Sequence, residues 1–145
     1  MNDPDFIDDA LQALWRAAGL SPLVIGERRL LPVVQGGMGV GISAHRLAGS
    51  VAAQGAVGTL SSIDLRRHHP DLMARCAEHG VGKGAKAAID AANIEALQRE
   101  IAAAKQLAQG HGLLAVNVMR AVGEYAALVR ASLEAGIDAV VVGAG

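Results

Sequence analysis

A run of glycines is the part of this chain best suited to bind a ligand through its backbone. The run is Gln35-Gly36-Gly37-Met38-Gly39-Val40-Gly41-Ile42-Ser43, and it lies between an apolar stretch and a helical pattern. Glycine tolerates positive φ and leaves peptide groups bare, so a planar or anionic ligand can lie against the main chain. The N-terminus of a following helix adds partial positive charge. We therefore predict a site for a flavin or a nucleotide phosphate, with a tight turn that binds nothing as the alternative.

The same glycines also fit the dinucleotide-binding spacing G-x-G-x-x-A. Gly39, Gly41 and Ala44 take its three positions, and Asp64 follows about 20 residues later, as the ribose carboxylate does in that fingerprint. In the fingerprint, however, the carboxylate lies at the tip of the second strand, and Asp64 comes after the predicted strand has ended. The match is therefore weak, and the dinucleotide site is an alternative to the flavin site.

The remaining polar residues do not form a pattern typical of a catalytic or metal centre. The five histidines are His45, His68, His69, His79 and His111. None is spaced with a patterned carboxylate, so we expect solvated surface positions for all of them. A metal pair of His68 and His69 is disfavoured, because adjacent residues rarely converge on one ion. Cys76 is the only cysteine, which excludes an internal disulfide, and we predict no redox role for it.

Helical and strand-like patterns alternate along the chain and should position the glycine loop. We first predict a helix from Asp3 and Pro4 to Gly19, a strand at 30–35, a helix at 44–54 capped by Ser43 and a strand at 56–60. A long excursion with one short helix should follow at 61–88. The rest of the chain should form a helix capped by Asp90 and ended by Gly110, a strand at 114–118, a helix at 122–135 and a strand at 139–142 closed by Gly143. Within the helix after Asp90, Glu95 and Arg99 are spaced as an i,i+4 ion pair.

Three times a helix ends at glycine and a buried strand follows, which is a βα repeat. Four such units make half of a (β/α)8 barrel, whose full form has about 250 residues. An open, doubly wound parallel sheet would be complete at about this length, and the residues alone leave both architectures open. We divide the chain into an N-terminal helix and linker, 1–29, and a βα domain, 30–145. The helix could close the bottom of a barrel or pack at its side.

Composition narrows the class of protein. Hydrophobic residues make up 52% and aromatic residues 2%, as expected of helices packed on parallel strands, so the fold class is α/β. Thirteen basic and fourteen acidic residues leave a net charge of -1, which gives no basic stripe for nucleic acid. No apolar run is long enough for a membrane helix, and the acidic N-terminus lacks a secretory pattern. We expect a soluble, cytoplasmic protein.

Three segments carry a resemblance to a known family. The first, Leu31 to Leu65, contains PVVQGGMGVGISAHRLAGSVAAQGAVGTLSSIDL; the second is LLAVNVMR, ending at Arg120; the third is GIDAVVVGAG, ending at Gly145. Together they resemble the bacterial nitronate monooxygenases, formerly called 2-nitropropane dioxygenases. The resemblance implies a (β/α)8 barrel that binds flavin mononucleotide (FMN), with this chain supplying strands one to four as its N-terminal half.

The resemblance also implies which residues contact the cofactor. Gly36, Gly37 and Met38 would line the flavin ring with backbone groups, Asn117 at the end of the third strand would hydrogen-bond its pyrimidine edge, and Gly143 ends the fourth strand. All lie at the strand ends where barrel sites are built. The family's catalytic histidine follows a Gly-Gly pair in the second half, which has no counterpart in these residues, so no catalytic residue is assigned.

The activity implied is oxidation of an alkyl nitronate by O2 to a carbonyl compound and nitrite. Its partners would be a small-molecule substrate and O2. Two alternatives stay open. One is a nicotinamide-dependent enoyl-thioester reductase on the same flavin barrel. The other is a non-catalytic half-barrel that pairs with a second half, as in a homo-oligomer, because four units leave sheet edges and apolar helix faces uncovered.

Overall fold

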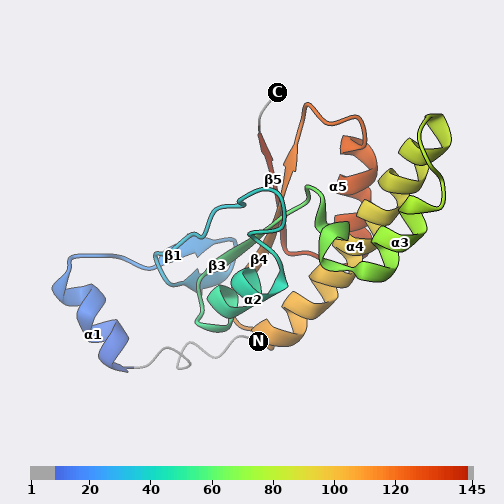
Figure 1. Cartoon of the computed structure of the whole chain (residues 1–145). Coiled ribbons are helices and arrows are strands. Elements are labelled where there is room, and N and C mark those ends of the chain that lie inside the picture. Colours follow the sequence, from blue (N-terminus) through green and yellow to red (C-terminus); the bar gives the residue numbers. More distant parts are fainter. Residues whose placement is uncertain (1–8, 144–145) are drawn as a thin grey trace.

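The computed structural model describes residues 9–143 and has a mixed α/β architecture around a parallel sheet (Figure 1). In chain order its elements are α1 (Asp9–Ala17), β1 (Leu23–Ile25), β2 (Arg28–Leu30), α2 (His45–Ala53), β3 (Val57–Ser61), the 3-10 helix η2 (Leu65–His68), α3 (Pro70–Ala77), α4 (Lys83–Ala108), β4 (Leu113–Met119), α5 (Tyr125–Glu134) and β5 (Ala139–Gly143). The predicted helix start at Asp3 and Pro4 lies outside the described residues.

The sheet has the parallel order β3-β4-β5, and residues 31–35 add an extended segment beside β3. Val34 forms a parallel bridge with Val57, and the Gln35 N–H donates to the Val57 carbonyl at 2.9 Å. The predicted strand at 30–35 is therefore an edge segment, while Leu30 belongs to β2. The four parallel segments are thus neighbours in the order of the sequence. In a doubly wound sheet the first strand lies between later ones.

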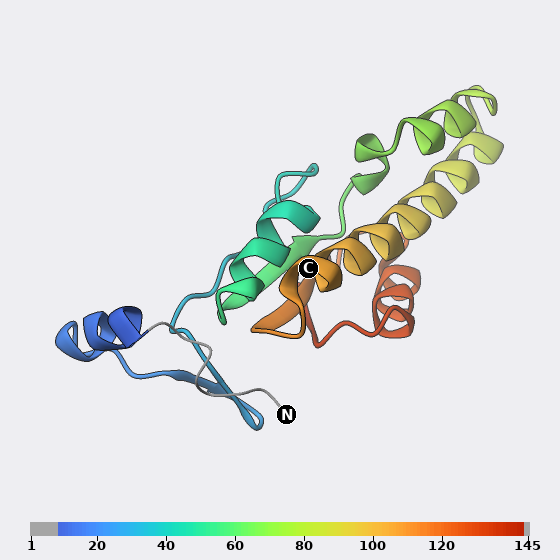
Figure 2. The same cartoon turned by 90° about the horizontal axis from the view of Figure 1, so that it is seen from below.

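The helices pack on one face of the sheet. Alternate residues of the strands point to that face, and Leu60, Val116 and Val118 join the main core, where each is fully buried. In the view from below, α4 runs past α2 and α5, and it packs against both (Figure 2). Gly58 allows close contact between β3 and α2, because a Cβ there would lie 1.9 Å from the Ala48 carbonyl oxygen.

The other face is covered at its amino end by the β1–β2 hairpin, which lies largely in the segment predicted to be a linker. Leu30 packs against Val57 and Leu113, the first residues of β3 and β4. Arg28 ties the hairpin to the sheet through the Gly112 carbonyl oxygen at 2.7 Å and the Asp138 carboxylate at 2.8 Å. Helix α1 lies beyond the hairpin, away from the sheet (Figure 1). The hairpin, not the helix, therefore closes this end.

The predicted excursion at 61–88 is largely helical. It contains η2, α3 and the first turn of a 26-residue α4. Asp90 was predicted to cap the helix, but it lies inside α4, where Lys86 pairs with it at 2.6 Å. The helix begins earlier, at Lys83, and the residue before it, Gly82, takes a φ of +123°. The ion pair between Glu95 and Arg99 is confirmed at 2.6 Å.

None of the helices described at residues 9–143 has the length and apolar content needed to span a membrane. The three-stranded parallel sheet with helices on one face agrees with the α/β class. Membership of this sheet in a (β/α)8 barrel stays a prediction.

Candidate functional site

The glycine loop leaves the sheet at Gln35, whose side chain continues the β-ladder. Its Oε1 accepts from the Thr59 N–H at 2.9 Å and its Nε2 donates to the Thr59 carbonyl at 3.2 Å. A carboxamide carries the same donor and acceptor as a peptide group, so it replaces the backbone partner that β3 loses where the loop departs. The loop is thereby anchored at its first residue.

Ser43 anchors the other end of the loop, and the prediction that it caps α2 is wrong. Its fully buried hydroxyl accepts from the Met38 N–H at 2.8 Å and donates to the Gly36 carbonyl at 3.2 Å. The Ser43 N–H donates to the Met38 carbonyl at 3.1 Å. The residue at the cap of α2 is Ala44, which provides no side-chain bond. Ser43 is therefore used to shape the loop.

Gly37 and Asn117, both predicted to contact a flavin, lie against each other. A Cβ on Gly37 would lie 2.5 Å from the Asn117 Cβ and 3.2 Å from its Nδ2. Asn117 alternates with Val116 and Val118, so it points to the face opposite the helices. Within residues 9–143, neither the Asn117 carboxamide nor the Gly37 N–H has a protein partner. Two donors and an acceptor are thus left free at one place.

The other residues predicted to contact a flavin, Gly36, Met38 and Gly143, make no such close contact with one another. Gly36 and Gly143 have open space where a Cβ would be, and Gly143 lies opposite Met119 at the end of β5. Because Ser43 takes both backbone groups of Met38, only the Met38 side chain, 46% exposed, is left to meet a ligand. This changes the expected contact from backbone to thioether.

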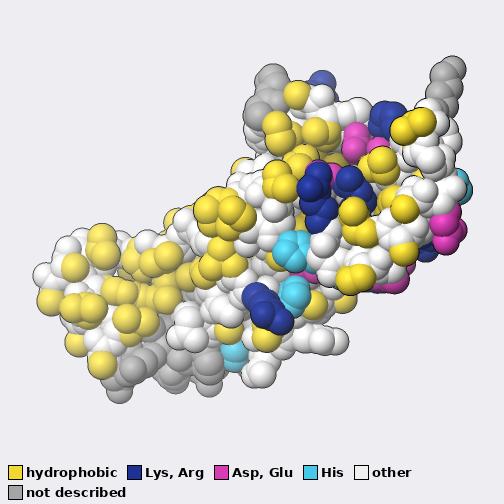
Figure 3. All heavy atoms as spheres, viewed as in Figure 1, with side chains coloured by type: hydrophobic (Ala, Val, Ile, Leu, Met, Phe, Trp, Pro, Cys, Tyr) yellow, Lys and Arg dark blue, Asp and Glu magenta, His cyan; other side chains and the backbone are white. Residues whose placement is uncertain are grey.

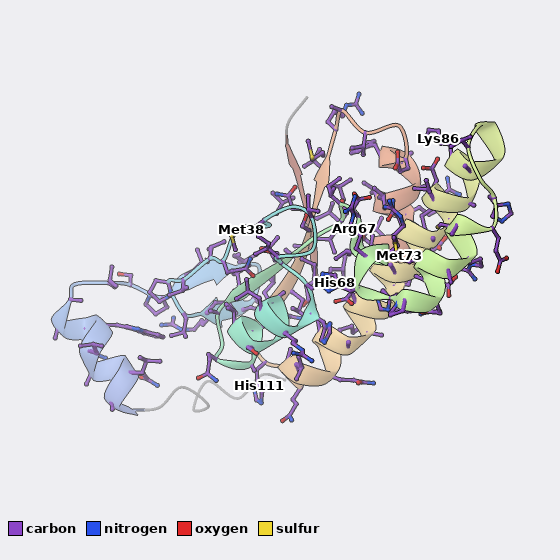
Figure 4. The ribbon with its side chains drawn as sticks, viewed as in Figure 1. Met38, Arg67, His68, Met73, Lys86 and His111 are labelled. Atoms are coloured by element: carbon purple, nitrogen blue, oxygen red, sulfur yellow. The ribbon has the colours of Figure 1, made fainter. Side chains whose placement is uncertain are left out.

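The loop contains a strained residue and a second close contact. Val40 has a φ of +53°, which a β-branched side chain adopts at a cost of about 1–3 kcal/mol. Gly41 packs against His68, whose Nε2 lies 2.8 Å from the Gly41 carbonyl oxygen. Figure 4 shows Met38 and His68 on opposite sides of the loop. The loop thus has one end toward Asn117 and another toward η2.

Asp64, the ribose-binding residue of the dinucleotide alternative, is engaged by protein. Its carboxylate pairs with Arg66 and lies 3.2 Å from the Arg67 Nε. A ribose hydroxyl would have to compete with two guanidinium groups there. This contact disfavours the dinucleotide site.

The expectation of solvated histidines without a carboxylate is wrong for two of the five. His45 Nδ1 lies 2.7 Å from Glu100 Oε2, and His69 Nε2 lies 3.0 Å from Glu100 Oε1. The His45 N–H also donates to Glu100 Oε2 at 2.8 Å, so a carboxylate from α4 caps α2. His79 is exposed as expected, while His111 is partly buried. No group of three or more metal-ligating side chains suited to a metal occurs in the described ranges.

Glu100, the acidic residue that His45 and His69 share, is buried, with 2% of its side chain exposed. Burial raises the pKa of its carboxyl, but the hydrogen bonds from the His45 backbone and ring, and the charges of His45 and His69, outweigh burial. The pKa of Glu100 therefore lies below its ordinary value. The sequence held a signal for this residue, since Glu100 occurs three residues after Leu97 on the apolar face of its helix.

Comparisons of the chain with protein-family models, with curated proteins and with solved structures found no match. Function is therefore inferred from the residues, their geometry and the family resemblance.

Proposed function

We propose that this chain binds FMN at the carboxyl ends of its parallel strands, as part of an oxidoreductase that oxidises alkyl nitronates. The contact between Gly37 and Asn117, with unpartnered hydrogen-bonding groups on both residues, carries the proposal. The flavin's pyrimidine edge alternates donors and acceptors, and a carboxamide beside a backbone N–H offers the complementary set. Bound FMN would take electrons from the nitronate and pass them to O2, which yields a carbonyl compound and nitrite.

The chain's own residues would bind and orient the ring. The Gly37 N–H would donate to a ring acceptor, and Asn117 would donate through Nδ2 and accept through Oδ1. The missing Cβ of Gly37 lets the Asn117 side chain lie directly against the loop backbone, which brings these groups together. Gln35 and Ser43 would act as positioning residues, since they fix the two ends of the loop. A site fixed before binding loses less entropy when the ligand binds.

The architecture gives separate support. The four parallel segments are adjacent in sequence order, with helices on one face, which is the arrangement of consecutive units in a (β/α)8 barrel. The candidate residues lie in or just beyond the carboxyl-terminal part of these segments, and barrel enzymes build their sites at that end. Ser62 follows β3 at this end, and its buried hydroxyl has no partner in the described part of the chain.

Flavin binding tests the proposal directly. We expect the chain to quench FMN fluorescence in a saturable titration. Asn117→Ala should weaken FMN binding about tenfold, the loss expected for one or two ligand hydrogen bonds. Gly37→Ala should weaken it by a similar factor, because its Cβ would displace the Asn117 side chain. Gly39→Ala is the matched control, since a Cβ there meets nothing within 4 Å.

The outcomes separate the alternatives. Absence of saturable FMN binding by the wild-type chain contradicts the proposal. Loss with Gly39→Ala but not with Gly37→Ala supports the dinucleotide alternative. If FMN binds, the loaded protein should release nitrite from an alkyl nitronate in air. Flavin reduction by NADH or NADPH without nitrite release points instead to the enoyl-thioester reductase.

A further inference from the structure

A pocket of about 500 Å³ lies between α2, η2 and α4, at the opposite end of the glycine loop from Asn117. Its charged and titratable lining consists of His45, Arg46, His68, His69 and Glu100. Figure 3 shows histidine side chains and basic side chains gathered on this face of the molecule. A pocket of this size is large enough for a small ligand.

The carboxylate of Glu100 is already engaged by protein groups. Its carboxylate receives the His45 N–H and the His45 ring at 2.8 and 2.7 Å, and the His69 ring lies at 3.0 Å. This carboxylate, not a ligand, also occupies the N-terminus of α2. The lining therefore has one acidic group that is satisfied and several basic groups around it.

The basic groups that are left can meet a ligand. Arg46 is exposed, and its guanidinium has no partner within residues 9–143. His45 uses Nδ1 toward Glu100 and His68 uses Nε2 toward the Gly41 carbonyl oxygen, so each ring keeps its second nitrogen. A protonated imidazole offers an N–H at that nitrogen, and a neutral imidazole offers a lone pair. The pocket is therefore most attractive to an anion when the rings are protonated.

The pocket also has apolar surface. Ile42 is 65% exposed at its edge and Leu47 is partly buried in its wall. From these observations we propose that the pocket binds a small phosphate monoester, with Arg46 as the permanent cation, His45 and His68 as the pH-dependent donors, and Ile42 and Leu47 against the ester's carbon portion. This site is independent of the proposed flavin site.

Calorimetry with two probes tests this site on the wild-type chain. Phenyl phosphate tests the ester class, and inorganic sulfate tests pH dependence, because its charge is constant between about pH 6 and pH 8 while imidazoles titrate. We expect sulfate to bind more tightly at the lower pH. Phenyl phosphate should bind more tightly than inorganic phosphate, since the ring covers apolar surface. Arg46→Gln should weaken phenyl phosphate binding about tenfold through loss of a charge-assisted bond.

Arg130→Gln is the matched control, because Arg130 is an exposed arginine on α5 that does not line the pocket. It should leave phenyl phosphate affinity unchanged. The proposal is overturned by absence of saturable binding of phenyl phosphate at either pH. Equal affinity in the wild type and Arg46→Gln also overturns it, as does sulfate binding that does not strengthen at the lower pH. Thermal unfolding of both variants, expected to match the wild type, shows that the fold is kept.

Discussion

Glu100 shows how one side chain can connect several elements. It belongs to α4, caps α2 through the His45 N–H, and contacts the ring of His69 just before α3. A carboxylate on the buried side of a helix is expected to destabilise the fold unless its oxygens accept hydrogen bonds or pair with charges. Burial alone would raise the pKa of Glu100, but the His45 N–H and the His45 ring hydrogen-bond to its carboxylate and the His69 ring lies 3.0 Å away, and together these groups lower it.

Glu100→Gln should destabilise the fold by about 2 kcal/mol near neutral pH, because the carboxamide faces a ring N–H with a donor of its own. A lowered folded-state pKa means that the ionised carboxylate stabilises the folded state above the unfolded value, about 4.3. This stabilisation is lost as the pH falls through the lower folded-state value. Urea unfolding of both proteins should therefore show a difference that shrinks below about pH 4. A difference independent of pH would show that ionisation of Glu100 does not contribute.

At the scale of elements, the closest packing joins α2 to β3. Gly58 lies at this contact, and the atoms nearest to a Cβ there are the backbone carbonyl and Cα of Ala48. Backbone cannot move aside as a flexible side chain can. The position of α2 also bears on the candidate site, since Ser43, just before α2, hydrogen-bonds to the glycine loop, and His45, its first residue, hydrogen-bonds to Glu100.

Gly58→Ala should destabilise the protein by about 3 kcal/mol, the cost of an added methyl group that forces two elements apart. Gly84→Ala is the matched substitution in the first turn of α4, where a Cβ meets nothing within 4 Å. It should stabilise by about 0.5–1 kcal/mol through helix propensity. Chemical denaturation of both variants measures the two effects. Equal stabilities would mean that α2 can shift from β3 without loss.

Sequence predicted the elements with strong patterns and missed those whose positions depend on distant contacts. The strands β3, β4 and β5 are short apolar runs that follow a glycine, and their predicted ranges agree with the structure to within one residue at each end. The expected burial is found for β3 and for most of β4 but not for β5, which is partly buried to exposed. The hairpin was missed because strands of three residues show too little alternation. In the candidate site, the resemblance predicted Asn117 as a contact residue. The roles of Gln35 and Glu100 were not predicted, because they depend on partners 24 and 55 residues away in the sequence.

At the scale of the molecule, the two faces of the sheet differ in what covers them. Helices cover β3 and β4 on one face, whereas the other face is covered by the hairpin at the amino ends and by the glycine loop near Asn117. Val141 of β5 lies in register with Asn117 and is 47% exposed. Val142, on the other face, is exposed to the same extent, so β5 is an open edge of the sheet on both sides. An open apolar edge is expected if further strands complete a barrel, in line with the proposed architecture.

The hairpin should be a structural part of the sheet domain, and Leu30→Ala tests this. Leu30 is 2% exposed and packs against the amino ends of β3 and β4, so its truncation should cost about 2–4 kcal/mol. Val24→Ala in the same hairpin is the control, because Val24 is 60% exposed and should change stability by less than about 0.5 kcal/mol. Urea unfolding followed by circular dichroism measures both. If Leu30→Ala unfolds at the wild-type midpoint, the hairpin is an appendage, and the amino end of the sheet is stable without it.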